Sequence, residues 1–130
     1  MRKWIWNYSN GVDMLKYHVE QVNQVRIITL EGQLSIMEKD VLRGILDKEK
    51  DVKENEYILE FSQVFYIDSF GISFIQNILL GNSQKRKLII VSDREYIRYV
   101  LRFNKLDKMM NVSFARNLEE GLGVFDHEGK

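Results

Sequence analysis

The first part of the chain has the alternating apolar and polar pattern of half-buried strands. Residues 15–21 alternate loosely, and residues 25–30 are rich in β-branched side chains. The pair Asn23-Gln24 between them is typical of a tight turn, so the two segments predict a β-hairpin. We expect Gly32 to end the second strand.

After this hairpin the apolar spacing becomes helical. Ser35 and Glu38 have the spacing of a capping box. Four apolar residues follow at helical intervals: Met37, Val41, Ile45 and Leu46. The charged run 47–56 is interpreted as a solvated helix end that leads into the next strand.

The middle of the chain predicts a strand, a turn and a second helix. Residues 57–61 form an apolar strand, and residues 62–67 are interpreted as a short connection. The turn 68–71 then opens an apolar helical stretch over residues 72–80.

Strand and helix patterns continue to alternate up to the C-terminus. The strands are expected at 88–91 and 110–114. One helix follows Ser92 and is expected to end at Asn104-Lys105, with Asn104 able to adopt the left-handed conformation. Another follows the cap Asn117, with three apolar residues directed inward: Leu118, Leu122 and Phe125. The chain therefore predicts an α/β fold with an opening hairpin, a mixed sheet and about four helices.

Composition limits the function. The 130 residues suffice for one domain, and 19 basic residues balance 19 acidic ones, so nucleic acid is not an expected partner. The basic clusters 84–87 and 94–102 are interpreted as solvated helix ends. There is no Cys, and His18 and His127 are expected at the surface, so neither a metal nor another cofactor is expected. No apolar run has the length of a membrane span, and we expect a cytoplasmic protein without a membrane partner.

The segment Asp68-Ser69-Phe70-Gly71 carries the most functional information. A Ser at a strand-to-helix turn lies near free backbone N–H groups and the positive end of the helix dipole, where a phosphate would find donors. Ser and Asp are also the commonest helix caps. Ser69 is therefore either a regulatory phosphorylation site or a cap.

Residues 14–125 resemble a STAS domain, and specifically the bacterial anti-sigma factor antagonists. Three segments carry the resemblance: the strand and turn 30–34, the central segment 58–72 that contains Asp68-Ser69-Phe70-Gly71, and the helix and turn 100–110. Two departures stand out. The family usually has a second small hydroxyl residue where this chain has Phe70, and a Gly where it has Lys105.

The resemblance implies a partner-switching cycle in which the chain is not an enzyme. The unphosphorylated antagonist binds an anti-sigma factor that is also a serine kinase, and a sigma factor is released. The kinase then phosphorylates Ser69, which weakens the complex until a serine phosphatase removes the phosphate. The partner-binding residues expected from the resemblance and the helix pattern are Asp68, Ser69, Phe70, Gly71, Phe74 and Ser35.

Within this surface, Phe70, Phe74 and Ile78 are expected along one exposed side of the helix, beside a core series that begins at Ile72. Phe70 is either a partner-binding anchor or a side chain that packs on the preceding loop.

Two alternatives belong to other functional classes. One is a STAS module with a scaffold, lipid-transport or ligand-sensing role, in which Ser69 is only a cap. The other is a small enzyme that uses Asp68 and Ser69. The enzyme is the weaker alternative, because the sequence places no activating His or Lys near Ser69.

The N-terminal segment lies outside the resemblance. We expect residues 1–13 to be an extension, residues 14–126 the STAS domain and residues 127–130 a tail. Trp4, Trp6 and Tyr8 share a face if the extension is a strand. It is interpreted as an added edge strand or, alternatively, as a contact in a homodimer.

Overall fold

The computed structural model describes residues 7–8, 15–81 and 86–128. Within these residues, six strands form one sheet in the order β1-β2-β3-β4-β5-β6. The strands are β1 (Asn7–Tyr8), β2 (Leu15–Val22), β3 (Val25–Leu34), β4 (Glu56–Ile67), β5 (Lys87–Val91) and β6 (Val112–Ala115). The helices are α1 (Lys39–Glu49), α2 (Ser69–Leu80), α3 (Glu95–Phe103) and α4 (Leu118–Glu128), with 3-10 turns η1 (Ile36–Glu38) and η2 (Leu106–Lys108). The predicted α/β fold is confirmed.

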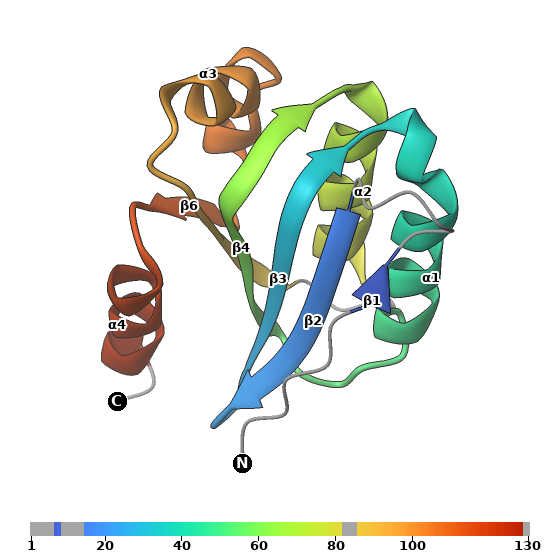
Figure 1. The fold of residues 1–130 in the computed structure, drawn as a ribbon. Coiled ribbons are helices and arrows are strands. Elements are labelled where there is room, and N and C mark those ends of the chain that lie inside the picture. The colour runs from blue at the N-terminus through green and yellow to red at the C-terminus, as the bar shows by residue number, and fades with distance from the viewer. Residues whose placement is uncertain (1–6, 9–14, 82–85, 129–130) are drawn as a thin grey trace.

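The sheet is mixed, as the sequence predicted. β1, β2 and β3 pair antiparallel, and β3 to β6 pair parallel. Asn23 has a φ of 56° in the turn of the β2–β3 hairpin, a conformation that Asn tolerates better than most residues. Because β3, β4 and β5 are parallel, their C-terminal ends lie at one edge of the sheet, at the top of Figure 1. The turns that lead into η1, α2 and α3 therefore share this edge.

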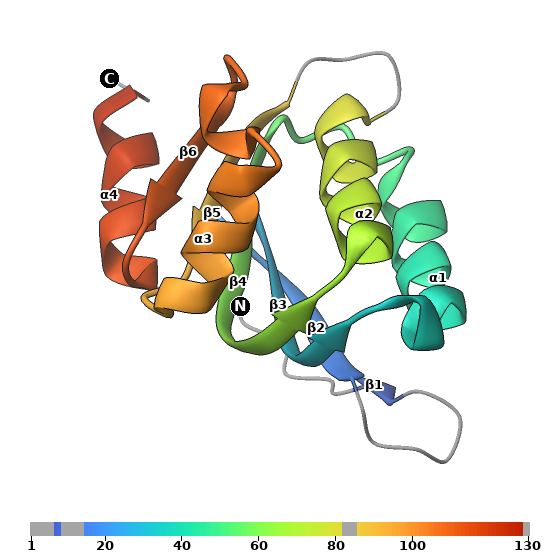
Figure 2. The same cartoon turned by 90° about the horizontal axis from the view of Figure 1, so that it is seen from above.

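Helices cover both faces of the sheet. The larger core lies between the sheet and the helices α1, α2 and α3, and a smaller core lies under α4 (Figure 2). Neighbouring strand residues point to opposite faces, so that Leu59 belongs to the larger core and Ile58 to the smaller one. Strands buried on both sides explain the continuous apolar runs in the parallel part of the sheet.

Two strands are longer than the sequence predicted. Gly32 does not end β3, which continues to Leu34 through register shifts on either side of this glycine. Residues 62–67, interpreted as a connection, are the second half of β4 and pair with the end of β3. The irregular pairing hides the period of two that a regular strand would show, so the sequence pattern ends too early.

The predictions for the ends of the later helices are confirmed in part. The side chain of Asn117 accepts a hydrogen bond from the backbone N–H of Glu120 at 2.8 Å, which confirms it as a cap. After α3 the left-handed residue is Lys105, with a φ of 63°, and not Asn104, whose φ is −90°. This is the position at which the family usually has Gly.

Two basic side chains expected at the surface are buried. His18 is 1% exposed and lies 3.9 Å from Glu20, and Arg86 is 2% exposed. Arg86 donates hydrogen bonds to the backbone carbonyls of Ile78, Glu49 and Val52 at 2.9, 2.6 and 3.3 Å. A charged side chain can be buried when hydrogen bonds satisfy its polar groups. Arg86 in this way caps the C-terminal ends of α1 and α2.

A buried polar cluster surrounds this arginine. Its guanidinium lies 4.5 Å from the ring centre of Tyr57, whose hydroxyl donates to Glu49 at 2.8 Å. Arg26 also donates to Glu49, at 2.6 Å in the shorter of two hydrogen bonds. Burial, together with the adjacent Glu49 carboxylate, raises the pKa of Tyr57 well above its ordinary value. Glu49, at the beginning of the run that was interpreted as fully solvated, is 3% exposed.

The chain termini lie partly outside the described residues. Asn7 and Tyr8 pair with Tyr17 and Lys16 at the edge of the sheet. Trp4, Trp6, the side chain of Tyr8 and the side chain of His127 lie outside the described part of the chain. At the other end, α4 continues to Glu128, past the domain boundary expected at residue 126.

Candidate functional site

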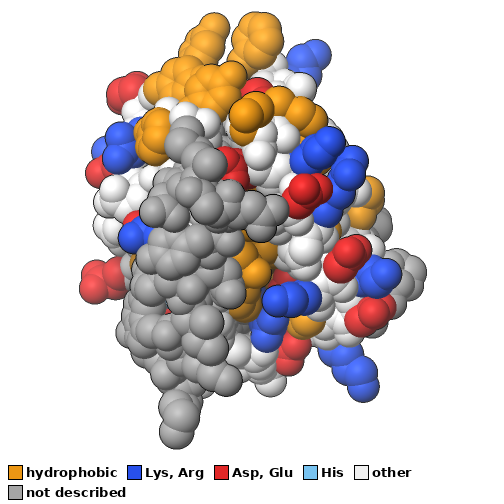
Figure 3. All heavy atoms as spheres, turned by 45° about the vertical axis from the view of Figure 1, so that its right-hand side comes forward, with side chains coloured by type: hydrophobic (Ala, Val, Ile, Leu, Met, Phe, Trp, Pro, Cys, Tyr) orange, Lys and Arg blue, Asp and Glu red, His pale blue; other side chains and the backbone are white. Residues whose placement is uncertain are grey.

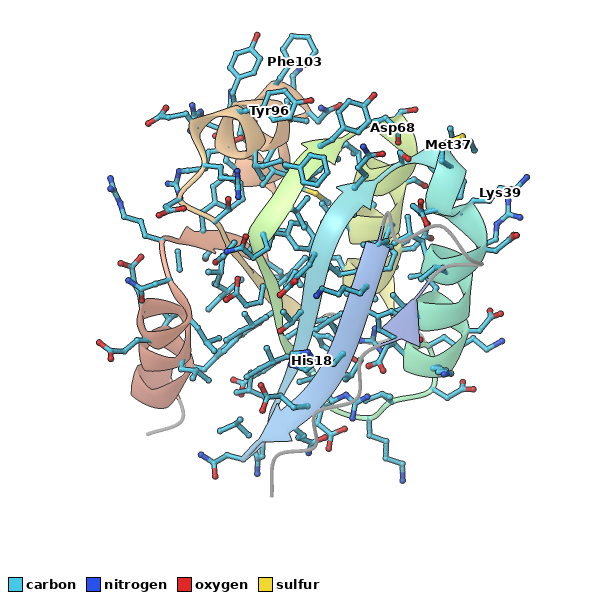
Figure 4. All side chains as sticks on the ribbon, in the orientation of Figure 1. His18, Met37, Lys39, Asp68, Tyr96 and Phe103 are labelled. Atoms are coloured by element: carbon cyan, nitrogen blue, oxygen red, sulfur yellow. The ribbon has the colours of Figure 1, made fainter. Side chains whose placement is uncertain are left out.

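The turn between β4 and α2 is built around the carboxylate of Asp68. One carboxylate oxygen accepts hydrogen bonds from the backbone N–H groups of Phe70 at 2.8 Å and Gly71 at 3.2 Å. The other oxygen accepts from the backbone N–H of Ile36 at 3.0 Å. Asp68 therefore caps α2 and also ties it to η1. Figure 4 shows Asp68 and Met37 at the same edge of the molecule.

Ser69 is the first residue of α2, and its side chain is exposed. Within the part of the chain that the structure describes, its hydroxyl makes no hydrogen bond. The cap interpretation of Ser69 is therefore wrong, because Asp68 performs that role. The N–H groups of Phe70 and Gly71, expected to receive a phosphate, already bind Asp68.

Gly71 is buried and has a steric role. A Cβ at this position would lie 2.5 Å from the carbonyl oxygen of Leu34 and 2.8 Å from the side chain of Ile67. Only Gly lets the first turn of α2 approach the end of β3 so closely. The structure thus places Gly71 in the scaffold of the turn, whereas its contact with a partner stays a prediction.

Phe74 is 1% exposed and Ile78 is fully buried, so the predicted exposed side of α2 is wrong. Helix α2 lies between α1 and α3 and also packs on the sheet (Figure 2). Because it has neighbours on several sides, it buries more of its circumference than a helix with one core face. Both side chains belong to the larger core.

Ser35 is also buried, at 3% exposed. Its hydroxyl accepts a hydrogen bond from the backbone N–H of Met37 at 3.2 Å, which starts η1. Its predicted cap role is confirmed, and its burial leaves little of the side chain exposed for the partner contact expected from the resemblance.

Ile36 and Met37 on η1 are the residues near this turn that the sequence analysis missed. They are 53% and 80% exposed, and the hydrogen bond of Ile36 to Asp68 places them beside the beginning of α2. The sequence placed Met37 in one apolar series at helical spacing with Val41, Ile45 and Leu46. The 3-10 turn that precedes α1 changes this spacing, so Met37 points outward.

Phe70 is half-buried and packs against the larger core. The guanidinium of Arg43 on α1 lies 5.7 Å from the centre of its ring, within the range of a cation–π contact. Much of the ring therefore serves the packing of α2 against α1, and the rest faces solvent.

Two further kinds of feature are absent from the described residues. They contain no group of three or more His, Asp or Glu side chains arranged to hold a metal ion. None of the helices among them is both long and apolar enough to cross a membrane. The exposed hydroxyl of Ser69 lies at a helix start that the Asp68 cap fixes.

The model of the STAS domain family matches residues 16–121. The chain belongs to this family. The match covers most of the described residues and includes the Asp68-Ser69 turn. A comparison with the curated proteins finds no match.

Solved structures with the same fold include anti-sigma factor antagonists. A candidate antagonist from Thermotoga maritima is 25% identical with a TM-score of 0.73, and the match covers 83% of this chain and 92% of that one. SpoIIAA, a Bacillus cell fate determinant solved in its phosphorylated form, is 18% identical with a TM-score of 0.62 and coverages of 84% and 98%. A sulfate transporter family protein from Wolinella succinogenes is 19% identical with a TM-score of 0.66 and coverages of 82% and 88%.

Proposed function

We propose that this STAS protein is an anti-sigma factor antagonist that acts by partner switching. Unphosphorylated, it binds an anti-sigma factor that is also a serine kinase. Phosphorylation of Ser69 releases it, and a serine phosphatase restores the binding form. The observation that carries the proposal is the exposed hydroxyl of Ser69 at the rigid start of α2.

The fold tolerates a phosphate at this position. A phosphoserine carries about −1.5 to −2 charges, and the N-terminus of a helix favours an anion. The Asp68 carboxylate already occupies the N–H groups of Phe70 and Gly71. Its negative charge therefore directs the phosphate outward, so that modification changes the surface and leaves the core as it is.

The loss of partner binding follows from the surroundings of Ser69. Ile36 and Met37 form an exposed apolar surface beside the turn. A partner that covers them also covers Ser69, and burying a nearly dianionic phosphate against apolar side chains is costly. The proposed partner surface is therefore η1 together with Asp68, Ser69 and the exposed edge of Phe70, without Phe74, Gly71 or Ser35.

The comparisons support this proposal. SpoIIAA is an anti-sigma factor antagonist of the same fold, and it has been solved both with and without its phosphate. In the proposed cycle the kinase and the phosphatase perform the chemistry. This chain is their substrate and the binding partner of the kinase, acts in the cytoplasm and needs no cofactor.

Phosphate incorporation tests the proposed site. The wild-type chain, incubated with its anti-sigma kinase and ATP, is expected to gain one phosphate by intact mass, and Ser69→Ala is expected to gain none. Ser73→Ala is the matched control, because Ser73 is exposed one turn further along α2. It is expected to be phosphorylated like the wild type. Phosphate mapped to another residue, with Ser69 unmodified, would contradict the proposal.

A further inference from the structure

A second surface of the molecule carries exposed aromatic rings that the proposed cycle does not require. They lie on α3 and at the end of β4, and Figure 3 shows hydrophobic side chains gathered at that end of the molecule. We call this surface the aromatic face and define it by Phe65, Tyr66, Tyr96, Tyr99 and Phe103, which are 51%, 41%, 46%, 58% and 72% exposed.

The α3 part of the face is a continuous stripe. Tyr96, Tyr99 and Phe103 are spaced by three and four residues, so they lie on one side of the helix. The rings of Tyr99 and Phe103 are stacked, with centroids 6.1 Å apart and an interplanar angle of 28°. The buried residues Ile97 and Leu101 lie on another side of the helix. The stripe therefore lies on a different side of α3 from the one that packs against the core.

The β4 part of the face lies next to this helix. Arg94, immediately before α3, donates a hydrogen bond to the carbonyl of Ser62 on β4 at 3.1 Å. Phe65 and Tyr66 follow on the same strand, which ends at Ile67, and Tyr66 lies three residues before Ser69. The aromatic face therefore adjoins the Ser69 turn, on the side of the turn away from α1.

The size of the face corresponds to a small protein interface. At roughly 200 Å² for a whole aromatic side chain, the exposed fractions amount to about 500 Å². This is near the upper limit for an apolar patch on a monomer, about 300–600 Å². Two such surfaces in contact would bury about 1,000 Å² before any rim is counted, which is the lower limit for a specific interface.

We propose that the aromatic face binds a second copy of this chain in a two-fold symmetric dimer. The aromatic residues lack formal charge, so two faces can pack ring against ring. A two-fold axis brings the same patch of each copy together and closes the assembly at two.

This dimer has a consequence for the switch. Because Tyr66 is so near Ser69, a second copy on the aromatic face crowds the surface that the kinase is proposed to bind. Self-association therefore competes with partner binding. The small buried area makes the dimer weak, so that it dissociates upon dilution.

Sedimentation equilibrium of the full chain, without any partner, tests for the dimer at protein concentrations from about 1 to about 500 μM. The dissociation constant of an interface of this size is expected to lie within this range. The wild type is expected to change from monomer to dimer within it. The double variant Tyr99→Ser/Phe103→Ser is expected to raise the dissociation constant at least about tenfold. Met110→Ser is the matched control. Met110 is 93% exposed and lines a hollow with residues from the beginning of β5, at the opposite end of the parallel strands.

Circular dichroism and urea unfolding of each variant establish that it is folded. A wild-type chain that stays monomeric over the whole concentration range overturns the proposal. The aromatic face would then be a binding surface for a different protein. A dimer that the double variant forms as tightly as the wild type also overturns it, because the contact then lies elsewhere, for instance at the β1 edge. Neither result bears on phosphorylation of Ser69, so this proposal and the proposed function fail independently.

Discussion

At the scale of single residues, Asp68 has a larger part in the site than its place in a short motif suggests. Its three accepted hydrogen bonds connect the start of α2 with η1, two segments separated by about thirty residues of sequence. The motif predicted that a residue of this turn would cap the helix. It could not predict the bond to Ile36, because that bond depends on how β3 and β4 end side by side.

We expect Asp68→Ala to lower the free energy of unfolding by about 2 kcal/mol, because it removes a helix cap and leaves a second backbone N–H without its acceptor. Urea unfolding measures this loss. Asp93→Ala is the control. Asp93 is exposed just before α3, whose cap residue Arg94 makes no side-chain capping bond, and the change should remain within about 0.5 kcal/mol. Equal losses in the two variants would contradict the role assigned to Asp68.

Lys105 holds a left-handed backbone conformation, with a φ of 63°, that disfavours a residue with a Cβ. We expect Lys105→Gly to raise the free energy of unfolding by about 0.5–1 kcal/mol, because the relief of this strain exceeds the added entropy of the unfolded chain. Asn104→Gly, at a φ of −90°, should lower it instead. Thermal unfolding of both variants shows whether each change stabilises or destabilises the protein. A loss of stability in Lys105→Gly would contradict the backbone strain assigned to Lys105.

At the scale of elements, the sequence predicted the type and order of the helices and strands well. The hairpin, the alternation and the Asn117 cap depend on local signals that tertiary contacts do not change. The second half of β4 was missed, because its register against β3 is irregular. The exposed side of α2 was also misassigned, because the sequence of an apolar helix does not show how many neighbours surround it.

Helix α2 allows a direct test of its corrected orientation. We expect Phe74→Ala to destabilise the protein by about 3–5 kcal/mol, since it opens a cavity in the larger core. Phe70→Ala should cost only about 1–2 kcal/mol, because the ring is half-buried and loses mainly its contacts with the core and Arg43. Urea unfolding compares the two. A larger loss of unfolding free energy for Phe70→Ala than for Phe74→Ala would contradict the orientation of α2 in the structure.

At the scale of the whole molecule, the buried cluster around Arg86 joins elements that are distant in the sequence. It connects the ends of α1 and α2 with the beginning of β4. The sequence placed Arg86 in a solvated basic cluster, since its neighbours Lys85 and Lys87 are also basic. Only the assembled fold brings the three carbonyls to the guanidinium, so no local pattern could have revealed its burial.

We expect Arg86→Met to lower the free energy of unfolding by about 3 kcal/mol. The substitution keeps an apolar stem but leaves buried carbonyls without donors and removes the cation from the Tyr57 ring. Arg102→Met, at an exposed position of α3, is the control and should remain within about 0.5 kcal/mol. Denaturant unfolding of both variants provides the comparison. Equal stability of the two would show that the cluster does not stabilise the fold.

In the proposed function, negative charge at Ser69 switches partner binding without changing the fold. Titration of the wild type, Ser69→Ala and Ser69→Asp against the anti-sigma kinase with ADP measures this effect of charge, after unfolding curves have shown equal stability. The wild type and Ser69→Ala should bind alike. Ser69→Asp should bind about tenfold more weakly or worse, although it carries less charge than a phosphate. Equal affinities for all three proteins would show that charge at this turn is not the switch.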